Sequence, residues 1–230
     1  MTDRLAAALA DLESRADGSG GAGLARFRIV TADRVIGMSM KQVQASAKLF
    51  RKDHALAQAL WDSGVYEARM LACHVDDPRL VTPAQMDAWS RDFDNWATCD
   101  TACFVLFDRT PHAFGRVDAW AGRKDEYGRR AAFALLASLA LHDKQAADAP
   151  FLERLVLIEQ AAGDDRNFVK KAVNWALRGI GARKSPVLQA AALAMAERLS
   201  ASGVASARWV GKDAARQLKA RAAKTAARTA

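Results

Sequence analysis

The sequence has little of what builds sheets, disulfide frameworks or membrane spans. Aromatic residues make up 7% of the 230 residues, and no segment alternates apolar and polar residues as a half-buried strand does. Three cysteines, an odd number, favour a reducing compartment. The longest apolar stretches, such as 131–141, are too short to cross a bilayer. We therefore expect a cytoplasmic protein that does not associate with a membrane.

The signatures of several common catalytic sites are also missing. The glycine-rich segment 18–23 lacks the Lys-Ser/Thr ending of a phosphate-binding loop, which indicates a flexible link. Cys99 and Cys103 lie one helical turn apart and could join His112 at a metal, but this spacing matches no standard zinc pattern. Small buried cysteines are the commoner interpretation. We expect neither a metal nor a cofactor.

What the sequence does have is helix-forming residues at helical spacing. Alanine, leucine and arginine dominate, and the connections between apolar-periodic segments are short and carry Gly, Pro or Asp. Thr82 before Pro83 predicts a helix start, with the threonine as N-cap. The expected helices include 3–16, 65–75, 95–108, 111–122, 126–142, 150–162, 166–184, 185–202 and 206–222.

These helices predict an all-α fold, either a globular bundle or a superhelical solenoid of antiparallel helix pairs. We favour the solenoid, of HEAT-like (ARM-type) repeats, because pairing consecutive helices gives units of about 40 residues. The expected units are 39–80, 82–122, 126–162 and 166–202. We expect one monomeric domain over 1–222, opened by an N-terminal helix and glycine-rich link over 1–24. A basic tail follows at 223–230, and its order is left open.

The distribution of charge matters more than its sum. The net charge is +8, but the segment from Ser206 onwards holds seven Lys or Arg and one acid, so it carries +6 of that excess. A basic tail by itself predicts non-specific attraction to polyanions. Evidence for a specific partner must therefore come from local groups in the body of the chain.

The first informative block is 92–107. Trp96 and Asp100 are four residues apart and share one face of the expected helix. Phe104, Val105 and Phe107 are expected to face the core. A tryptophan on a helix is usually a core residue, but an aspartate one turn along is unusual on an apolar face.

The second block is the basic helix expected over 166–184. Lys171, Trp175 and Arg178 share a face, which leaves the other face to the core residues Phe168, Ala172, Leu177 and Ile180. A solvated cationic helix is the simpler interpretation. A tryptophan inside a basic stripe, however, suits a phosphate backbone with a sugar or base nearby. Six basic residues and no acid lie in this stretch: Arg166, Lys170, Lys171, Arg178, Arg183 and Lys184.

The third block begins the helix expected over 126–142. Arg129 and Arg130 open an otherwise apolar segment, and Arg130 is expected to point onto the concave surface of the solenoid. The alternative is a pair of solvent-exposed arginines that have no functional role.

Together these blocks resemble the AlkD-like family of DNA alkylation repair glycosylases, which are HEAT-repeat proteins. The resemblance covers roughly residues 30–220, and the glycine-rich segment 18–23 matches least. Five segments carry it in the same order: YEARMLA at 66–72, Trp-x-x-x-Asp at 96–100, Arg-Ala-Ala from Arg130, FVKKAVNWALR with Trp175, and ARWVGKDAARQL at 207–218.

The resemblance implies roles for particular residues. Asp100, Trp96 and Trp175 would line a cleft that holds the damaged nucleotide, and Arg130 would contact DNA. The other DNA-binding residues that we expect are Lys171, Arg178, Lys170 and Arg129. The family often has a second acid immediately after the first tryptophan, and Ala97 stands there in this chain.

The chemistry supports the same prediction. Alkylation at N3 or N7 gives a purine a positive charge and makes it a good leaving group without a general acid, so a carboxylate near the sugar and two tryptophan faces are a sufficient set. We predict a DNA glycosylase, a hydrolase that excises cationic N3- or N7-alkylated purines from double-stranded DNA in base excision repair. The alternatives are a non-catalytic HEAT-repeat protein that recognises damaged or branched DNA, and a protein-binding scaffold.

Overall fold

The computed structural model describes residues 2–229 and is helical throughout, as predicted. Two compact units divide it, Met1–His112 and Ala113–Ala230. Within the described part of the chain, extended pairing is limited to one isolated bridge between Arg34 and Val65. No helix among these residues has both the length and the apolar character needed to cross a membrane.

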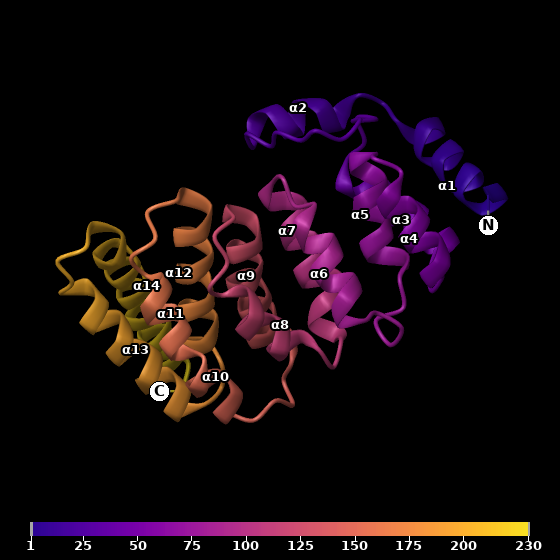
Figure 1. The fold of residues 1–230 in the computed structure, drawn as a ribbon. Coiled ribbons are helices and arrows are strands. Elements are labelled where there is room, and N and C mark those ends of the chain that lie inside the picture. The colour runs from indigo at the N-terminus through magenta and orange to yellow at the C-terminus, as the bar shows by residue number, and fades with distance from the viewer. Residues whose placement is uncertain (1, 230) are drawn as a thin grey trace. The chain divides into compact units, whose positions relative to one another are not determined.

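The first unit contains seven α-helices, followed by a π-helical and a 3-10 turn, within residues 2–112 (Figure 1). The helices are α1 (Thr2–Arg15), α2 (Ser19–Arg26), α3 (Met40–Phe50), α4 (His54–Asp62), α5 (Tyr66–Val75), α6 (Pro83–Arg91) and α7 (Trp96–Thr101). Thr82 caps α6 as predicted, because its hydroxyl oxygen accepts a hydrogen bond from the amide of Gln85 at 3.2 Å.

The core of the first unit forms around α5, which packs against α3, α4 and α7. Two tryptophans fill much of it. Trp61 and Trp89 stack face to face, with ring centroids 4.0 Å apart. The indole nitrogen of Trp61 donates to the carboxylate of Asp92 at 2.8 Å, so the buried ring leaves no polar atom without a partner.

The second unit contains the remaining helices of the described residues (Figure 1). They are α8 (Ala113–Trp120), α9 (Glu126–His142), α10 (Ala149–Glu153), α11 (Leu155–Ala161), α12 (Asn167–Gly181), α13 (Pro186–Ser200) and α14 (Ala205–Thr229). The predicted helix over 126–142 coincides with α9.

In the second unit α12 packs between α9 and α14. Arg130 of α9 contacts Phe168 at the start of α12, and Gly179 near its end lies against Ala140. Asn174 and Arg178 of α12 likewise donate to Asp213 and Gln217 of α14, in the same order along both helices. Contacts in this order along the chain mean that α9, α12 and α14 run parallel, as the second helices of successive HEAT-like pairs do.

The predicted repeat boundaries are wrong by one helix in this unit. The helices α8 and α9 form a pair, and so do α13 and α14. The expected units 126–162 and 166–202 instead began each pair at α9 and α12. The spacing of apolar residues does not distinguish the first helix of a pair from the second, because both helices are amphipathic.

The glycine-rich segment 18–23 was expected to be a flexible link, but Gly18 caps α2 and residues 19–23 form its first turns. Its glycines allow close packing. A Cβ on Gly20 would lie 2.1 Å from the carbonyl oxygen of Met38, and the Gly20 amide donates to the Gly37 carbonyl at 2.9 Å. Gly20 therefore docks α2 directly onto the backbone at 37–38.

The basic tail that begins at residue 223 continues α14 as a helix as far as Thr229. Ala230 lies outside the described residues.

The helix predicted over 95–108 ends early, because α7 passes into a π-helical turn over Ala102–Leu106. A π turn inserts an extra residue and rotates the following side chains. Phe107 is buried as predicted, whereas Phe104 and Val105 are only half-buried. Cys103 is buried, in agreement with the commoner interpretation of the cysteines, and Leu106 is buried as well.

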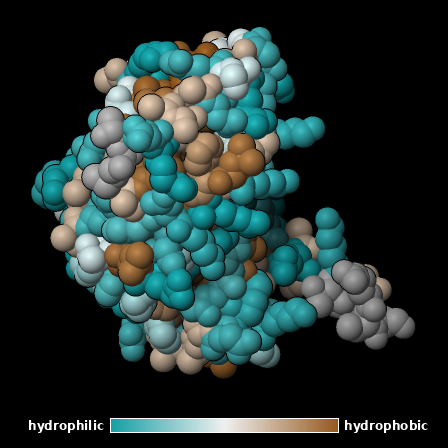
Figure 2. Space-filling view, turned by 90° about the vertical axis from the view of Figure 1, so that its right-hand side faces the viewer, coloured by the Kyte–Doolittle hydropathy of each residue, from teal (hydrophilic) through white to brown (hydrophobic). Residues whose placement is uncertain are grey.

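Figure 2 looks onto the right-hand side of Figure 1, where most of the surface is hydrophilic and the apolar side chains form separate small groups. Isolated exposed apolar residues are normal on a folded protein.

Candidate active site and nucleic-acid interface

The first turn of α7 positions Trp96 and Asp100. Asn95 caps this helix: its side-chain oxygen accepts hydrogen bonds from the amides of Ala97 at 2.9 Å and Thr98 at 3.0 Å. The side chain of Asn95 is buried and is held in turn by the Thr98 hydroxyl at 3.1 Å. This cap fixes where α7 begins, and so fixes the direction in which its first turn points.

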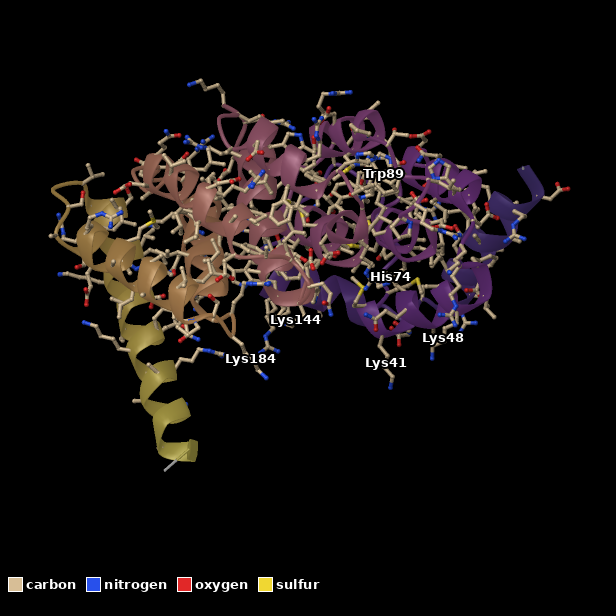
Figure 3. The ribbon with its side chains drawn as sticks, turned by 90° about the horizontal axis from the view of Figure 1, so that it is seen from below. Lys41, Lys48, His74, Trp89, Lys144 and Lys184 are labelled. Carbon is tan, nitrogen blue, oxygen red and sulfur yellow. The ribbon has the colours of Figure 1, made fainter. Side chains whose placement is uncertain are left out.

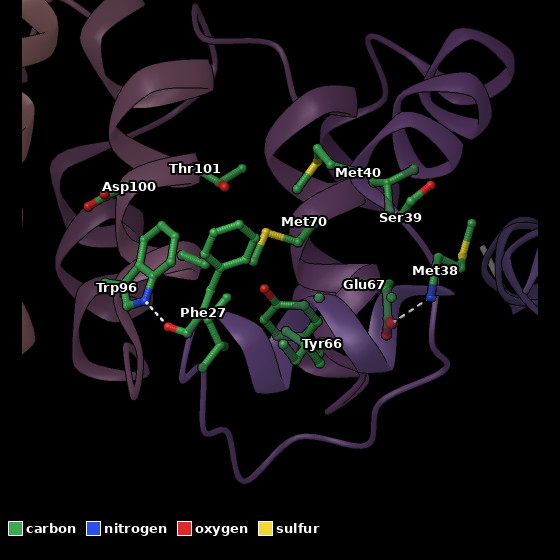
Figure 4. A pocket seen from close by; sticks show the side chains of 16 residues that line it. Phe27, Met38, Ser39, Met40, Tyr66, Glu67, Met70, Trp96, Asp100 and Thr101 are labelled. Atoms are coloured by element: carbon green, nitrogen blue, oxygen red, sulfur yellow. Dashed lines mark hydrogen bonds between the residues drawn. The ribbon is translucent and has the colours of Figure 1, made fainter. Parts of the chain in front are cut away.

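Trp96 and Asp100 both line a pocket of about 370 Å³ in the first unit. They lie at one end of it, and Met38 and Ser39 lie at the other (Figure 4). Its walls are mostly apolar, with few polar groups. The labelled lining side chains are Phe27, Met38, Ser39, Met40, Tyr66, Glu67, Met70, Trp96, Asp100 and Thr101.

The segment that follows α2 holds the indole of Trp96. The carbonyl oxygen of Phe27 accepts a hydrogen bond from the indole nitrogen at 3.4 Å, and the Phe27 ring lies edge-on to the indole with centroids 6.4 Å apart. In Figure 4 the Phe27 ring projects between Trp96 and Met70. The edge of the indole that carries its N–H group is therefore already in contact with protein.

Glu67 is a buried acid of this pocket that was not singled out from the sequence. It is 1% exposed, and its carboxylate accepts hydrogen bonds from the amides of Ile36, Gly37 and Met38 at 2.9, 2.7 and 3.1 Å. Three amide donors satisfy the carboxylate, so Glu67 fixes the backbone at 36–38. The sequence signal that could have identified Glu67 is its position inside the mostly apolar segment 66–72.

Tyr66 brings a hydroxyl group to the same pocket (Figure 4). Burial raises the pKa of Tyr66 well above its ordinary value, and the neighbouring Glu67 carboxylate adds to the effect. The phenol therefore stays protonated at physiological pH and remains able to donate a hydrogen bond.

Trp175 and Arg178 lie in the second unit, on α12. They line a shallow pocket of about 300 Å³ with small residues of α9 and α12 as its floor, including Ala137, Ala140 and Gly179. Lys171 is exposed one turn before Trp175. The structure thus places Lys171, Trp175 and Arg178 along one side of α12, as their spacing predicted.

A chain of hydrogen bonds orients Arg178. Its guanidinium donates to the side-chain oxygen of Gln217 at 2.5 Å, and the Gln217 amide donates to Asp213 at 2.7 Å. Hydrogen bonds to this carboxylate from Asn174 and Arg216 outweigh its partial burial and lower the pKa of Asp213 below its ordinary value. The carboxylate therefore stays ionised and holds Gln217 in place for Arg178.

The remaining expected DNA contacts have protein partners. Arg129 forms an ion pair with Asp164 at 3.0 Å. Lys170 is half-buried, and its ammonium lies 5.1 Å from the centroid of the Trp209 ring. These groups still present positive charge, but each is committed to a structural contact.

Arg130 does not point onto the surface as expected. It is 6% exposed, and its guanidinium donates to the carbonyl oxygen of Phe168 at 2.8 Å and lies over the Phe168 ring. The apolar helix face on which it stands packs against α12, so the arginine is buried along with that face. It ties α9 to the start of α12.

The cysteines that were considered as metal ligands are buried in the core. Neither Cys99 nor Cys103 forms a disulfide, and burial raises the pKa of the Cys103 thiol well above its ordinary value. Across the described residues, no group of three or more His, Cys, Asp or Glu is arranged to hold a metal ion.

Comparison with known proteins agrees with this architecture. A family described as "DNA alkylation repair enzyme" matches residues 8–218. A search of curated proteins finds no match. One solved structure, described as "a new family of proteins related to the HEAT-like repeat DNA glycosylases with affinity for branched DNA structures", superposes with a TM-score of 0.73 at 17% identity, covering 91% of this chain and 93% of that one.

The structural likeness shows an all-α, HEAT-like repeat fold. The family match begins at residue 8, well before the residue 30 expected from the sequence, and so it includes most of α1 and all of α2. It also spans both Trp96 with Asp100 and the basic stripe of α12. The chain belongs to the family of DNA alkylation repair enzymes.

Proposed function

We propose that this protein is a DNA glycosylase that excises cationic N3- or N7-alkylated purines from duplex DNA, as a step of base excision repair. The observation that carries the proposal is the placement of the Asp100 carboxylate one turn from the Trp96 indole, at the end of a pocket in the first unit. Family membership over residues 8–218 supports it.

The reaction needs one negative group near the sugar. The bond between C1′ and the purine nitrogen breaks, and its electron pair leaves with the base and neutralises the positive charge of the base. The sugar is left with oxocarbenium character, and water adds at C1′ and loses a proton. In our proposal Asp100 stabilises the developing positive charge and orients that water.

Aromatic faces support the same step. A tryptophan face attracts a cationic base or sugar by roughly 0.5–2 kcal/mol. We propose that Trp96 and Trp175 contribute in this way, and that Lys171 and Arg178 contact phosphates. Arg129 and Lys170 add positive charge nearby, whereas Arg130 acts through packing, since it is buried against Phe168.

The test is base release from methylated duplex DNA by the wild type and by Asp100→Asn. We expect the wild type to release 3-methyladenine or 7-methylguanine, and the variant to do so about 100-fold more slowly in single turnovers. Affinity for the duplex should change little, because the carboxylate makes no favourable contact with phosphate.

Asp62→Asn is the matched control, since Asp62 is an exposed aspartate of α4 in the same unit. It removes the same charge and should release base at the wild-type rate. The proposal is wrong if the wild type releases no base above background. Equal rates for Asp100→Asn and the wild type would remove Asp100 from the mechanism.

A second candidate is a protein that binds branched DNA without cutting a glycosidic bond. It is favoured by the solved structure of the same fold, whose family is described as having affinity for branched DNA. Binding to a four-way junction and to a duplex of equal length separates the two candidates. A strong preference for the junction, together with no base release, would support the second.

A further inference from the structure

We propose that a groove at the end of α12, formed by Lys144, Lys184 and Arg221, binds the phosphodiester backbone of DNA beyond the damaged nucleotide. This extends the nucleic-acid interface past Trp175 and Arg178 and rests on the proposed binding of duplex DNA. Lys144 and Arg221 lie outside the motifs that indicated DNA binding in the sequence, whereas Lys184 is the last residue of the basic stretch 166–184.

The groove consists of two adjoining hollows within the second unit. The first, of about 300 Å³, contains Trp175 and Arg178. The second, of about 490 Å³, extends to Lys184 and Ser185. Both are lined by Lys144, Ala182 and Arg221, so they are continuous.

Lys144 and Lys184 are available to a ligand. Both side chains are exposed, and they extend on the same side of the unit in Figure 3. Among the described residues, neither ammonium group has an acidic partner within ion-pair distance. Two unpaired cations beside one hollow repel each other, and an anion between them removes that repulsion.

The other groups that line the second hollow are already paired. The Arg183 guanidinium donates to the carbonyls of Asp143 and Ala146 at 2.6 and 2.8 Å, and so holds the loop that carries Lys144. Asp148, the acid of this lining, accepts a hydrogen bond from the Ser185 hydroxyl. The net charge left at the groove is therefore positive.

Arg221 forms the remaining side. Its guanidinium donates to the carbonyl oxygen of Ala182 at 3.1 Å, which anchors it at the boundary of the two hollows. A guanidinium fixed at this place adds positive charge where the two hollows meet. The small floor residues Ala140, Gly179 and Ala182 leave room for a phosphate and its sugar.

A simpler explanation is that these cations only complement the carboxyl ends of α9 and α12, which finish at His142 and Gly181. That explanation accounts for positive charge near the helix ends. It does not account for a hollow of small residues that continues from Trp175 to Ser185. An extended polyanion fits both the shape and the charge.

The test is the salt dependence of duplex binding, measured by fluorescence anisotropy with a labelled, undamaged duplex and the full chain. The variant is Lys144→Gln with Lys184→Gln. Each lost phosphate contact lowers the slope of log affinity against log salt by about 0.9, so we expect the slope to fall by roughly 1.8. Arg221→Gln added to this pair should lower it by about 0.9 more.

The control is Arg198→Gln with Lys219→Gln, which removes the same charge from the same unit. Both head groups pair with acids, Glu159 and Glu197, away from the groove lining. This control should keep the wild-type slope. If the groove variant shows the slope of the control, the inference is wrong while the proposed function stands. If the wild type does not bind duplex DNA, the proposed function itself fails.

A further experiment tests whether the groove binds the DNA backbone or free phosphate. Inorganic phosphate is added at constant ionic strength. If the groove binds the DNA backbone, phosphate competes weakly and equally with the wild type and the groove variant. Displacement of DNA from the wild type alone at low phosphate concentration would make the groove a site for a small anion and would overturn the proposal.

Discussion

Asp164 is a single carboxylate that joins two helices of the second unit. Arg166 donates to it through two nitrogens at 3.0 and 2.6 Å, and Arg129 of α9 reaches it at 3.0 Å. These hydrogen bonds and charges hold the pKa of Asp164 below its ordinary value of 3.8. The pair with Arg129 links the start of α9 to the loop before α12.

This arrangement predicts a pH dependence of stability. The folded pKa lies below the unfolded one, so the ionised carboxylate stabilises the fold at pH values above the unfolded pKa, and the gain is lost as pH falls through the folded pKa. We expect Asp164→Asn to lower the free energy of unfolding by about 1.5–3 kcal/mol at neutral pH. The difference from the wild type should shrink as pH falls below the ordinary value of 3.8.

Urea unfolding followed by circular dichroism at several pH values measures this. Asp165→Asn is the control, because the neighbouring Asp165 is exposed. It should track the wild type at every pH. A difference between Asp164→Asn and the wild type that stays constant down to about pH 3 would contradict the linkage argument.

Arrangements of residues that lie close together in the sequence were predictable. The partners of buried charged residues were not. Trp96 and Asp100 share a pocket because a helix turn fixes their spacing. Arg130 and Glu67 are different. The partner of Arg130 is a carbonyl 38 residues along the chain, and those of Glu67 are amides about 30 residues before it. No local pattern identifies partners at such distances.

At the scale of elements, α2 shows how glycine supports a site without giving flexibility. The Gly20 position touches backbone at 37–38, where the Glu67 carboxylate also binds. This docking brings Phe27, at the end of α2, against Trp96. The pocket wall therefore depends on close approach at one glycine.

We expect Gly20→Ala to undock α2, because its Cβ would lie 2.1 Å from the Met38 oxygen, a backbone atom. Amide hydrogen exchange over residues 19–40 should accelerate, with a stability loss of about 1–3 kcal/mol. The proposed release of alkylated bases should slow with it, since Trp96 loses its contact with Phe27.

Gly21→Ala is the matched control. Nothing lies within 4 Å of the Cβ position at Gly21, and the residue is exposed in the same helix. Alanine there should stabilise α2 by up to about 1 kcal/mol through its helix propensity. Faster exchange in Gly21→Ala, or wild-type exchange in Gly20→Ala, would show that α2 is not held by this contact.

Helices were predictable and their pairing was not. Cap signals and period located α6 and α9 well, since both are properties of adjacent residues. The π turn after α7 and the pairing of α8 with α9 depend on what each helix packs against. The helical state of residues 19–23 likewise depends on the contact of Gly20 with the backbone at 37–38.

At the scale of the whole molecule, the positive charge falls into two groups, one in the C-terminal segment and one on α12. The segment from Ser206 onwards holds most of the positive excess, and its last part continues α14. The stripe of α12, by contrast, combines cations with Trp175. The two should differ in what they recognise.

We expect removal of residues 223–230 to weaken binding to all polyanions alike. Two cations are lost, Lys224 and Arg228, so the salt slope should fall by at most about 1.8. The ratio of affinities for alkylated and undamaged duplex should not change. Competition with heparin and with both duplexes measures this. A loss of lesion preference on truncation would place the tail at the damaged nucleotide.

The hydrogen bond between Trp96 and the Phe27 carbonyl has a consequence for selectivity. The indole N–H is the only hydrogen-bonding group of a tryptophan side chain, and here the protein itself occupies it. In the proposed reaction Trp96 can therefore offer only its ring face, which responds to positive charge and not to the pattern of donors and acceptors on a base edge. Such a residue discriminates a charged purine from a neutral one while accepting adenine and guanine lesions alike.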